Sequence, residues 1–216
     1  MSPDDTITGL YDSGASPDRQ RELLTAGDVP VAVYGLGKMG LPLAGVYAEM
    51  TGNVTGVDID PAVVETINSG TSHVVGEPGL ETLIAEQVER GRLEATTDGP
   101  TAAANAAIHV IIVPTLLDDD GEPNLTTVES VIDDIAAGLS PGDLVIAEST
   151  LPPEPVETFS SHIWWRKADS RPTSSGSPFA RSERPRGRRC GTFAASIEGR
   201  WWHRRGEYTS RDNRVR

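Results

Sequence analysis

The chain has 216 residues and a formal net charge of −13 at pH 7. Its single Cys excludes an intrachain disulfide, which argues against an oxidising compartment. No apolar run approaches the roughly 18 residues of a membrane span, and the N-terminus lacks a secretory signal pattern. We therefore expect a cytoplasmic protein with no membrane partner.

The charge is divided sharply along the chain. Residues 1–159 contain 27 acidic and 5 basic side chains, whereas residues 160–216 contain 5 acidic and 14 basic ones. The first part has Lys38 as its only lysine, and a surface this acidic favours hydration at the cost of self-repulsion. We interpret it as adaptation to a salt-rich, halophilic cytoplasm; an acidic interaction surface is the alternative.

These differences predict three segments. Residues 1–28 are polar and acidic and are expected to be a mostly mobile extension, with a short helix over Arg19–Thr25. Residues 29–159 are expected to form one α/β domain. Residues 160–216 form a basic tail of unrelated composition.

The stretch that organises the domain begins with the apolar run Val31–Tyr34, which predicts a buried strand. Gly35, Gly37 and Gly40 follow in the spacing GxGxxG and lead into a helical pattern. A second strand then ends at Asp58, 18 residues after the third glycine. Glycines at this spacing allow a tight turn, close approach of a pyrophosphate and close helix packing, while the acid can bind a ribose. The stretch predicts a dinucleotide site, and the carboxylate favours NAD over NADP.

Strand and helix patterns continue to alternate after Asp58. Further strands are expected over 53–57, 93–96, 108–113 and 144–147, and helices from Pro61, from Leu80, over 102–105 and after an N-cap at Thr126 or Thr127. The alternation predicts a Rossmann-like, doubly wound parallel sheet that is incomplete at its end. Ligands of such sheets bind at the carboxyl ends of the strands.

Other chemistry-bearing residues give weaker signals. The cluster Asp118-Asp119-Asp120-Gly121 lacks the spacing of a calcium loop and is interpreted as a solvated turn. His162 and His203 have no partners at ligand spacing, so no metal is predicted. Cys190 stands among arginines and is not assigned a catalytic role.

Between residues 29 and 153 the motifs together resemble the N-terminal domain of the UDP-glucose/GDP-mannose dehydrogenase family, the nucleotide-sugar dehydrogenases. The matching pieces are Gly35–Ala44, Gly56–Asp60, Glu77-Pro78-Gly79-Leu80, Val113-Pro114-Thr115 and Glu148–Pro153. The resemblance implies an NAD site formed by Gly35, Leu36, Gly37, Lys38, Met39, Gly40, Asp58, Pro114, Thr115 and Thr150. Thr115 would border the nicotinamide, and Thr150 would position a catalytic water.

The resemblance also implies an activity. Such enzymes oxidise the C6 alcohol of a nucleotide sugar to a carboxylate by two hydride transfers to NAD⁺, with a Cys thiolate holding the intermediate, and a homodimer is expected of the full-length enzyme. The family's Pro-Glu motif, catalytic Lys and Asn, and nucleophilic Cys are not recognisable after Pro153. We therefore predict that this chain alone has no dehydrogenase activity and that its fold is compromised.

Two other interpretations remain open. A β-hydroxyacid or 6-phosphogluconate-type dehydrogenase also opens with a GLGxMG turn, although the motifs after Asp58 fit nucleotide-sugar enzymes better. In a different class, an NAD-binding regulatory or nucleic-acid-binding protein would use the basic tail, although nucleic acid is not the preferred partner.

The tail contains all four Trp residues and no Leu. Its abrupt start favours a change of reading frame in a GC-rich gene over a disordered basic arm, and we assign it no secondary structure. Resequencing the codons around 154–161 tests this, because another frame should then encode the missing family motifs.

Overall fold

The computed structural model describes residues 14–118, 120–140, 142–149, 193–196 and 201–202. Its helices are Pro17–Ala26 (α1), Gly40–Thr51 (α2), Pro61–Asn68 (α3), Leu80–Glu89 (α4), Gly99–Asn105 (α5) and Thr126–Gly138 (α6). Its strands are Val31–Tyr34 (β1), Val54–Val57 (β2), Leu93–Thr96 (β3), Ile108–Ile111 (β4), Leu116–Leu117 (β5), Pro123–Asn124 (β6), Leu144–Ala147 (β7), Phe193–Ser196 (β8) and Trp201–Trp202 (β9).

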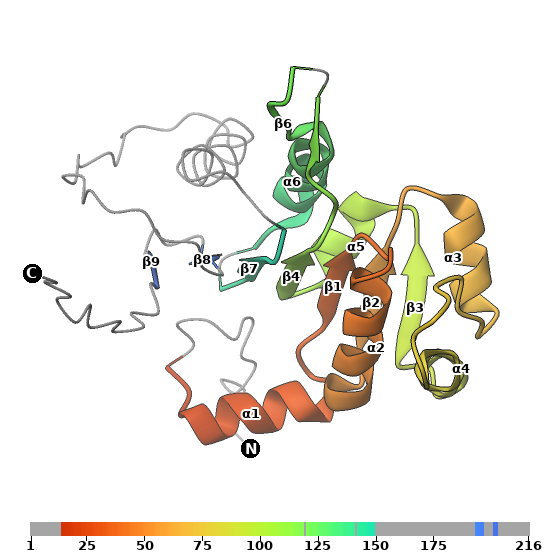
Figure 1. Cartoon of the computed structure of the whole chain (residues 1–216). Coiled ribbons are helices and arrows are strands. Elements are labelled where there is room, and N and C mark those ends of the chain that lie inside the picture. Colours follow the sequence, from red (N-terminus) through yellow and green to blue (C-terminus); the bar gives the residue numbers. More distant parts are fainter. Residues whose placement is uncertain (1–13, 119, 141, 150–192, 197–200, 203–216) are drawn as a thin grey trace, which may run out of the picture.

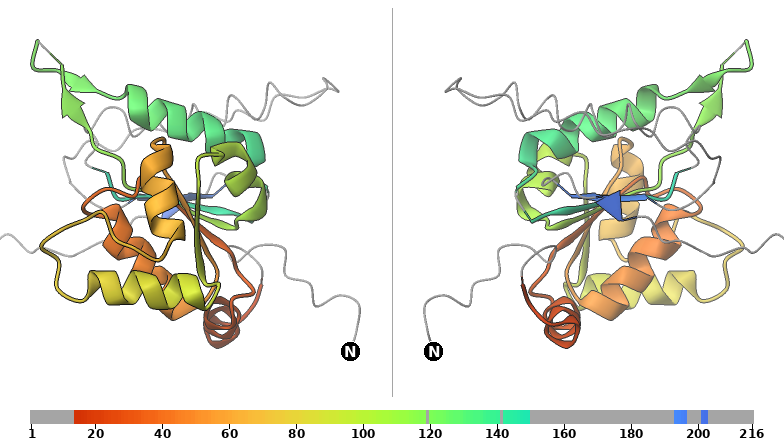
Figure 2. Two further views of the ribbon diagram at one scale, coloured as in Figure 1. Left: turned by 90° about the vertical axis from the view of Figure 1, so that its right-hand side faces the viewer. Right: turned by 90° about the vertical axis from the view of Figure 1, so that its left-hand side faces the viewer.

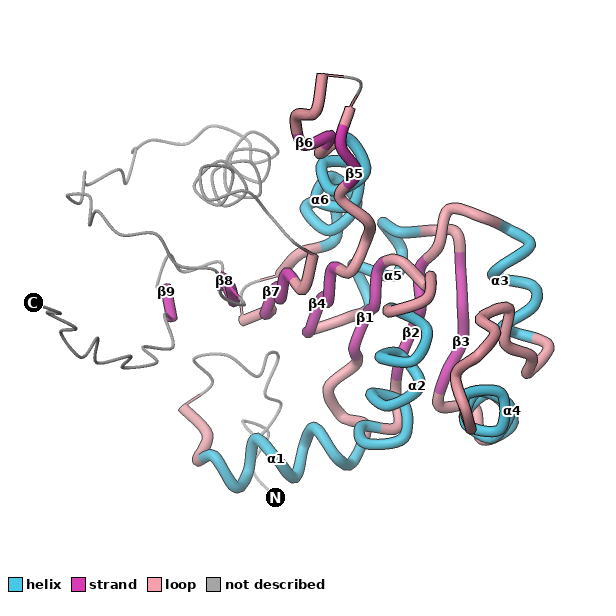
Figure 3. The backbone as a smooth tube through the Cα atoms, in the orientation of Figure 1, coloured by secondary structure: helices cyan, strands magenta, loops and turns pink. Residues whose placement is uncertain are grey.

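The main sheet has the strand order β3-β2-β1-β4-β7-β8-β9 (Figures 1 and 3). The first five strands are parallel, with β1 pairing β2 on one side and β4 on the other. Their order is that of a Rossmann sheet, in which the order of strands reverses: β2 and β3 are added on one side of β1, and β4 and β7 on the other. The predicted fold class is confirmed, and the reversal at β1 and β4 marks the edge where a ligand binds.

Helices cover both faces of the sheet (Figure 2). One core cluster gathers the buried side chains of α2, α3 and α4, and the other gathers those of α5 and α6. The second face is close-packed because Gly138 of α6 lies against the backbone of Ala103 and Ala104 in α5, where a Cβ atom would overlap. Leu144 and Ile146 of β7 are only partly buried on the α2 face.

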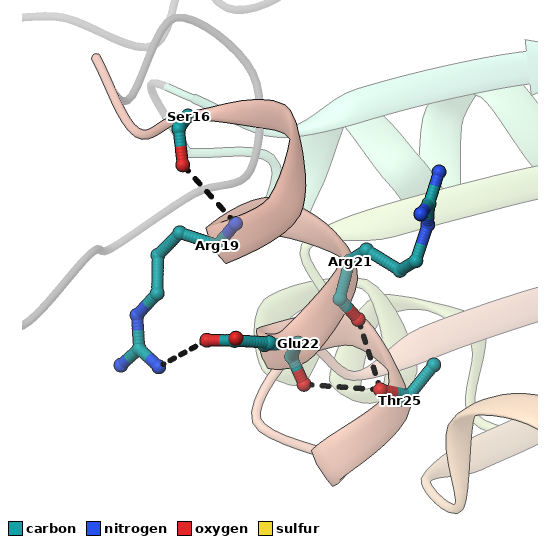
Figure 4. A network of polar contacts seen from close by, with 5 residues as sticks. All are labelled: Ser16, Arg19, Arg21, Glu22 and Thr25. Carbon is teal, nitrogen blue, oxygen red and sulfur yellow. Dashed lines mark hydrogen bonds and ion pairs between the residues drawn. The ribbon is translucent and has the colours of Figure 1, made fainter.

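The predicted short helix near the N-terminus is present and is longer than expected. Ser16 caps it by accepting a hydrogen bond from the backbone N–H of Arg19, and Arg19 also pairs with Glu22 (Figure 4). Leu23 is buried in the α2-side core. Residues 17–26 are therefore packed onto the domain, and the boundary at residue 29 stays a prediction.

Two predicted boundaries need correction. The strand expected over 108–113 ends at Ile111 because its neighbour β1 ends at Tyr34, after which Gly35 takes a φ of 94°. The backbone N–H of Ile112 still donates to the carbonyl oxygen of Tyr34 at 2.9 Å, and Val113 Cγ1 lies 2.9 Å from where a Cβ of Gly35 would be. Neither predicted threonine caps α6: the N-cap position is Leu125, and the Asn124 side chain accepts from the N–H of Thr126 at 3.0 Å.

Two short strands also lie in the basic tail. β8 pairs antiparallel with β7, and β9 pairs with β8. The prediction of no secondary structure beyond residue 159 is therefore wrong for these two elements. The outer edge of β7 presents backbone donors and acceptors that an added strand satisfies, which is the physical reason for pairing there. His162, Cys190 and His203 lie outside the described residues.

The opposite edge of the sheet is closed by a side chain. Asn68, at the end of α3, donates from Nδ2 to the carbonyl oxygen of Ala95 in β3 at 2.9 Å, and its Oδ1 accepts from the Ala95 N–H at 2.7 Å. The amide thus takes both hydrogen-bonding groups that a neighbouring strand would take from this residue.

Three polar side chains lie close together in the interior, on the side of the sheet that α5 and α6 cover. Tyr34 Oη lies 3.4 Å from His109 Nδ1, and His109 Nε2 lies 3.7 Å from Asp143 Oδ2. Asp143 also accepts from the N–H of Ser140, which ties the end of α6 to the start of β7. All three side chains are buried. Burial, with the charges of Asp134 and Asp143, raises the pKa of the Tyr34 hydroxyl above its usual range.

The raised pKa of Tyr34 predicts a loss of stability in alkali. The unfolded chain ionises this tyrosine from about pH 10, whereas the folded protein keeps it neutral, so its stabilising contribution is complete below that pH and declines above it. Urea unfolding between about pH 8 and pH 11 should show the decline. Tyr34→Phe should flatten it, and equal slopes for both proteins would contradict the prediction.

Candidate cofactor site

The glycine-rich turn between β1 and α2 is built by close contacts at two of its three glycines. Gly35 has φ of 94°, a left-handed conformation, and a Cβ there would lie 3.0 Å from the carbonyl oxygen of Ile112. A Cβ at Gly40 would overlap the carbonyl oxygen of Gly35 and lie 3.0 Å from Ile112 Cγ2. These two positions therefore admit only glycine without a shift of the backbone.

The middle of the turn is open instead. Gly37, Lys38 and Met39 are exposed, and a Cβ at Gly37 would have no heavy atom within 4 Å. Helix α2 starts here with Met39 as its N-cap, and no side chain caps it. An uncapped helix start beside an open glycine offers backbone N–H groups and partial positive charge to an anion.

Asp58 is joined to the turn by hydrogen bonds. Its Oδ2 accepts from the N–H of Leu36 at 2.8 Å, and its Oδ1 accepts from the N–H of Asp60 at 3.0 Å. The Leu36 side chain is fully buried and packs against Gly56, so it supports the turn from beneath. Asp60 in turn caps α3 through the N–H of Ala62. The half-buried Asp58 is thus held where both carboxylate oxygens retain capacity for a ribose.

The other half of the edge lies at the ends of β4 and β7. Pro114 is exposed and Thr115 is partly buried. Ser149 donates from Oγ to the carbonyl oxygen of Val113 at 2.7 Å, which joins the two strand ends. Ser149 belongs to the matching piece Glu148–Pro153, and the sequence alone predicted no role for it. Thr150 lies outside the described residues.

The loop after Thr115 contains the small hairpin of β5 and β6, which projects beyond this edge (Figure 1). Asp118 Oδ1 accepts from the N–H groups of Asp120 and Glu122, so the predicted solvated turn is confirmed as the end of a hairpin. Within the described residues, no group of three or more His, Cys, Asp or Glu side chains is arranged to hold a metal ion.

These parts fit a dinucleotide. The turn leaves open space only at its middle glycine, the helix start is uncapped, and a carboxylate stands at the end of the adjacent strand. In a parallel sheet with this strand order, that arrangement defines an NAD-type Rossmann domain.

Comparison with known proteins places this domain in a family. The NAD-binding domain model of the UDP-glucose/GDP-mannose dehydrogenase family matches residues 29–175, and the chain belongs to this family. The match continues beyond the boundary predicted at residue 159. The NAD cofactor is therefore that of the family, and the β-hydroxyacid dehydrogenase alternative is wrong.

Among similar proteins, the UDP-N-acetyl-D-mannosamine dehydrogenase of Yersinia pestis is 41% identical over 67% of this chain and 32% of its own length. The structure of a UDP-D-ManNAc dehydrogenase from Pyrococcus horikoshii superposes with a TM-score of 0.61 and 33% identity, over 65% of this chain and 33% of that one. A GDP-mannose dehydrogenase from Pseudomonas aeruginosa gives a TM-score of 0.60 and 28% identity, over the same shares. The chain spans about a third of the length of these relatives.

Proposed function

We propose that this chain supplies the cofactor-binding part of an NAD-dependent nucleotide-sugar dehydrogenase. The observation that carries the proposal is the glycine turn tied to Asp58 by the Leu36 N–H, within a chain of this family. Gly35, Gly37, Lys38, Met39 and Gly40 would surround the pyrophosphate. Asp58 would bind the adenosine ribose, while Pro114, Thr115 and Thr150 would border the nicotinamide half. NAD supplies the hydride acceptor; the residues named here bind and orient it.

The test separates binding from turnover. Titration calorimetry should show that the chain binds NAD⁺ more tightly than NADP⁺, because the 2′-phosphate of NADP⁺ would meet the Asp58 carboxylate. An assay with UDP-glucose or UDP-N-acetyl-D-mannosamine and NAD⁺ should give no steady NADH production. Absence of NAD⁺ binding would overturn the cofactor role, and steady NADH production would overturn the prediction of inactivity.

The names of the relatives support a substrate class. Their names give UDP-N-acetyl-D-mannosamine and GDP-mannose as the sugars of those enzymes. For the enzyme to which this chain corresponds, we propose a nucleoside-diphosphate sugar oxidised at C6, a homodimeric assembly and a cytoplasmic location. No helix in the described part of the chain is long and apolar enough to cross a membrane. Sedimentation of a full-length enzyme would test the dimer.

The acidic surface supports a salt-adapted protein. Glu49, Glu65 and Glu89 are exposed, and the first 159 residues hold more than five carboxylates for each Lys or Arg. Added salt screens the repulsion among these charges, with a Debye length of about 10 Å at 0.1 M and about 3 Å at 1 M. We expect the urea midpoint to rise with KCl over this range. Replacing all three glutamates by Gln should weaken the rise, and a flat response would contradict salt adaptation.

The nucleic-acid alternative would depend on residues 160–216, most of which lie outside the described residues. A salt-dependent shift of labelled RNA or DNA that is lost on deleting 160–216 would support it. The family match favours the dehydrogenase instead.

A further inference from the structure

The loops at the carboxyl edge of the sheet carry many negative charges. The described loops that follow β2, β3, β4 and β7 each carry carboxylates: Asp58, Asp60, Asp98, Asp118, Asp120, Glu122 and Glu148. In the described part of these loops and of the glycine turn, Lys38 is the only Lys or Arg. Charges of one sign along a cleft produce a field that acts on every charged ligand bound there.

Glu148 holds a defined position on this edge. It directly follows β7, and its backbone N–H donates to the carbonyl oxygen of Ile111 at 2.9 Å. The next residue, Ser149, donates from its backbone N–H to the same oxygen at 3.2 Å and from its side chain to Val113. The backbone of Glu148 is therefore fixed to the end of β4, while its side chain is exposed.

The charge of Glu148 also reaches the α2 side of the sheet. Burial, and after it the Glu148 carboxylate, raises the pKa of the Tyr47 hydroxyl on α2. Tyr47 is partly buried and packs against the same apolar core cluster as the partly buried Ile112 and Ile146. In surroundings of low dielectric constant such as these, the interaction between two charges is screened less than it is in bulk water.

The sheet order fixes the direction of a bound dinucleotide. With the adenosine ribose at Asp58 beside β2 and the pyrophosphate at the turn after β1, the nicotinamide half extends toward β4 and β7. The oxidised nicotinamide ring carries a positive charge, whereas the reduced ring is neutral. A carboxylate on this side therefore stabilises the oxidised cofactor specifically.

We propose that Glu148 is a specificity-determining residue that favours binding of NAD⁺ over NADH. This inference rests on the proposed cofactor role of the edge. At low salt, a unit charge several ångströms from the ring corresponds to about a three- to tenfold difference in affinity between the two redox forms. High salt should reduce it, because Glu148 is exposed. The same preference would help an NAD⁺-reducing enzyme release its NADH.

The experiment measures dissociation constants of NAD⁺, NADH and ADP-ribose for the full chain at about 0.1 M and about 1 M salt, where the Debye length falls from about 10 Å to about 3 Å. Glu148→Gln should lower the ratio of the NADH to the NAD⁺ constant about three- to tenfold at low salt. ADP-ribose, which lacks nicotinamide, should bind nearly as it does to the wild type. Glu89→Gln removes the same charge from an exposed site at the end of α4, beside the start of β3, and should leave the ratio unchanged.

Each outcome decides a separate point. An unchanged ratio in Glu148→Gln, with ADP-ribose still bound, overturns the role of Glu148. An equal change in Glu89→Gln also overturns it, because the effect would then be that of net charge. Failure of the wild type to bind NAD⁺ or ADP-ribose overturns the proposed function itself.

Discussion

Replacing Gly40 by Ala is expected to cost about 3 kcal/mol of unfolding free energy and to abolish measurable NAD⁺ binding. The added methyl group would overlap the carbonyl oxygen of Gly35, which is backbone and cannot rotate away. Relief requires α2 to move from β1, and this displaces the helix start from the turn. Urea unfolding and calorimetric titration of NAD⁺ measure the two effects.

Gly37→Ala is the matched control within the same turn. No heavy atom lies within 4 Å of its added methyl group, and Gly37 does not have a positive φ. Stability should therefore remain within about 0.5 kcal/mol of the wild type. If Gly37 faces the pyrophosphate, the methyl group occupies the space of the phosphates and NAD⁺ affinity falls. Unchanged NAD⁺ affinity in Gly37→Ala would contradict the placement of the pyrophosphate.

Asp58→Ala is expected to weaken NAD⁺ binding about 10- to 100-fold and to cost about 2 kcal/mol of stability. The truncation removes the acceptor for the N–H groups of Leu36 and Asp60, so the glycine turn and the start of α3 lose their common anchor. It also removes the proposed ribose ligand. Titrations with NAD⁺ and NADP⁺, together with urea unfolding, separate these losses.

Two comparisons make the Asp58 result specific. Asp58→Asn keeps an acceptor oxygen without the charge, so it should retain more stability than Asp58→Ala and should discriminate less against NADP⁺. Asp60→Asn removes the neighbouring charge while it keeps an acceptor for the N–H of Ala62, and it should leave the turn intact. If Asp60→Asn weakens NAD⁺ binding as much as Asp58→Ala does, the assignment of Asp58 as ribose ligand is wrong.

Local patterns were sufficient to predict most of the sheet. Val31–Tyr34, Leu93–Thr96 and Leu144–Ala147 are strands with the expected bounds. The first and third are short apolar runs between turn residues, which have few other buried conformations, whereas Leu93–Thr96 alternates buried Leu93 and Ala95 with exposed Glu94. The glycine spacing also identified the turn. These strands and this turn depend on residues that are close in the sequence, so local patterns are enough to predict them.

Individual side-chain contacts between distant residues were not predicted. The pairing of Leu36 with Asp58 crosses 22 positions, and the grouping of Tyr34 with His109 crosses 75. A histidine inside an otherwise apolar strand gives no local sign of its partners. Leu23 likewise showed no sign that α1 packs on the core, because a helix this polar is also compatible with an exposed segment.

The side-chain amide of Asn68 in α3, which is bonded to Ala95 of β3, determines at which edge the sheet can be extended. An amide that already occupies both groups of Ala95 hinders a further strand from pairing at that side, whether from another domain or from another molecule. Strands are added at the other flank instead, where β8 pairs with β7 and β9 pairs with β8. In the relatives, the residues that match this domain make up only about a third of the polypeptide. A single asparagine thus hinders association at one flank of the domain, while the other flank is the one at which the sheet is extended by β8 and β9.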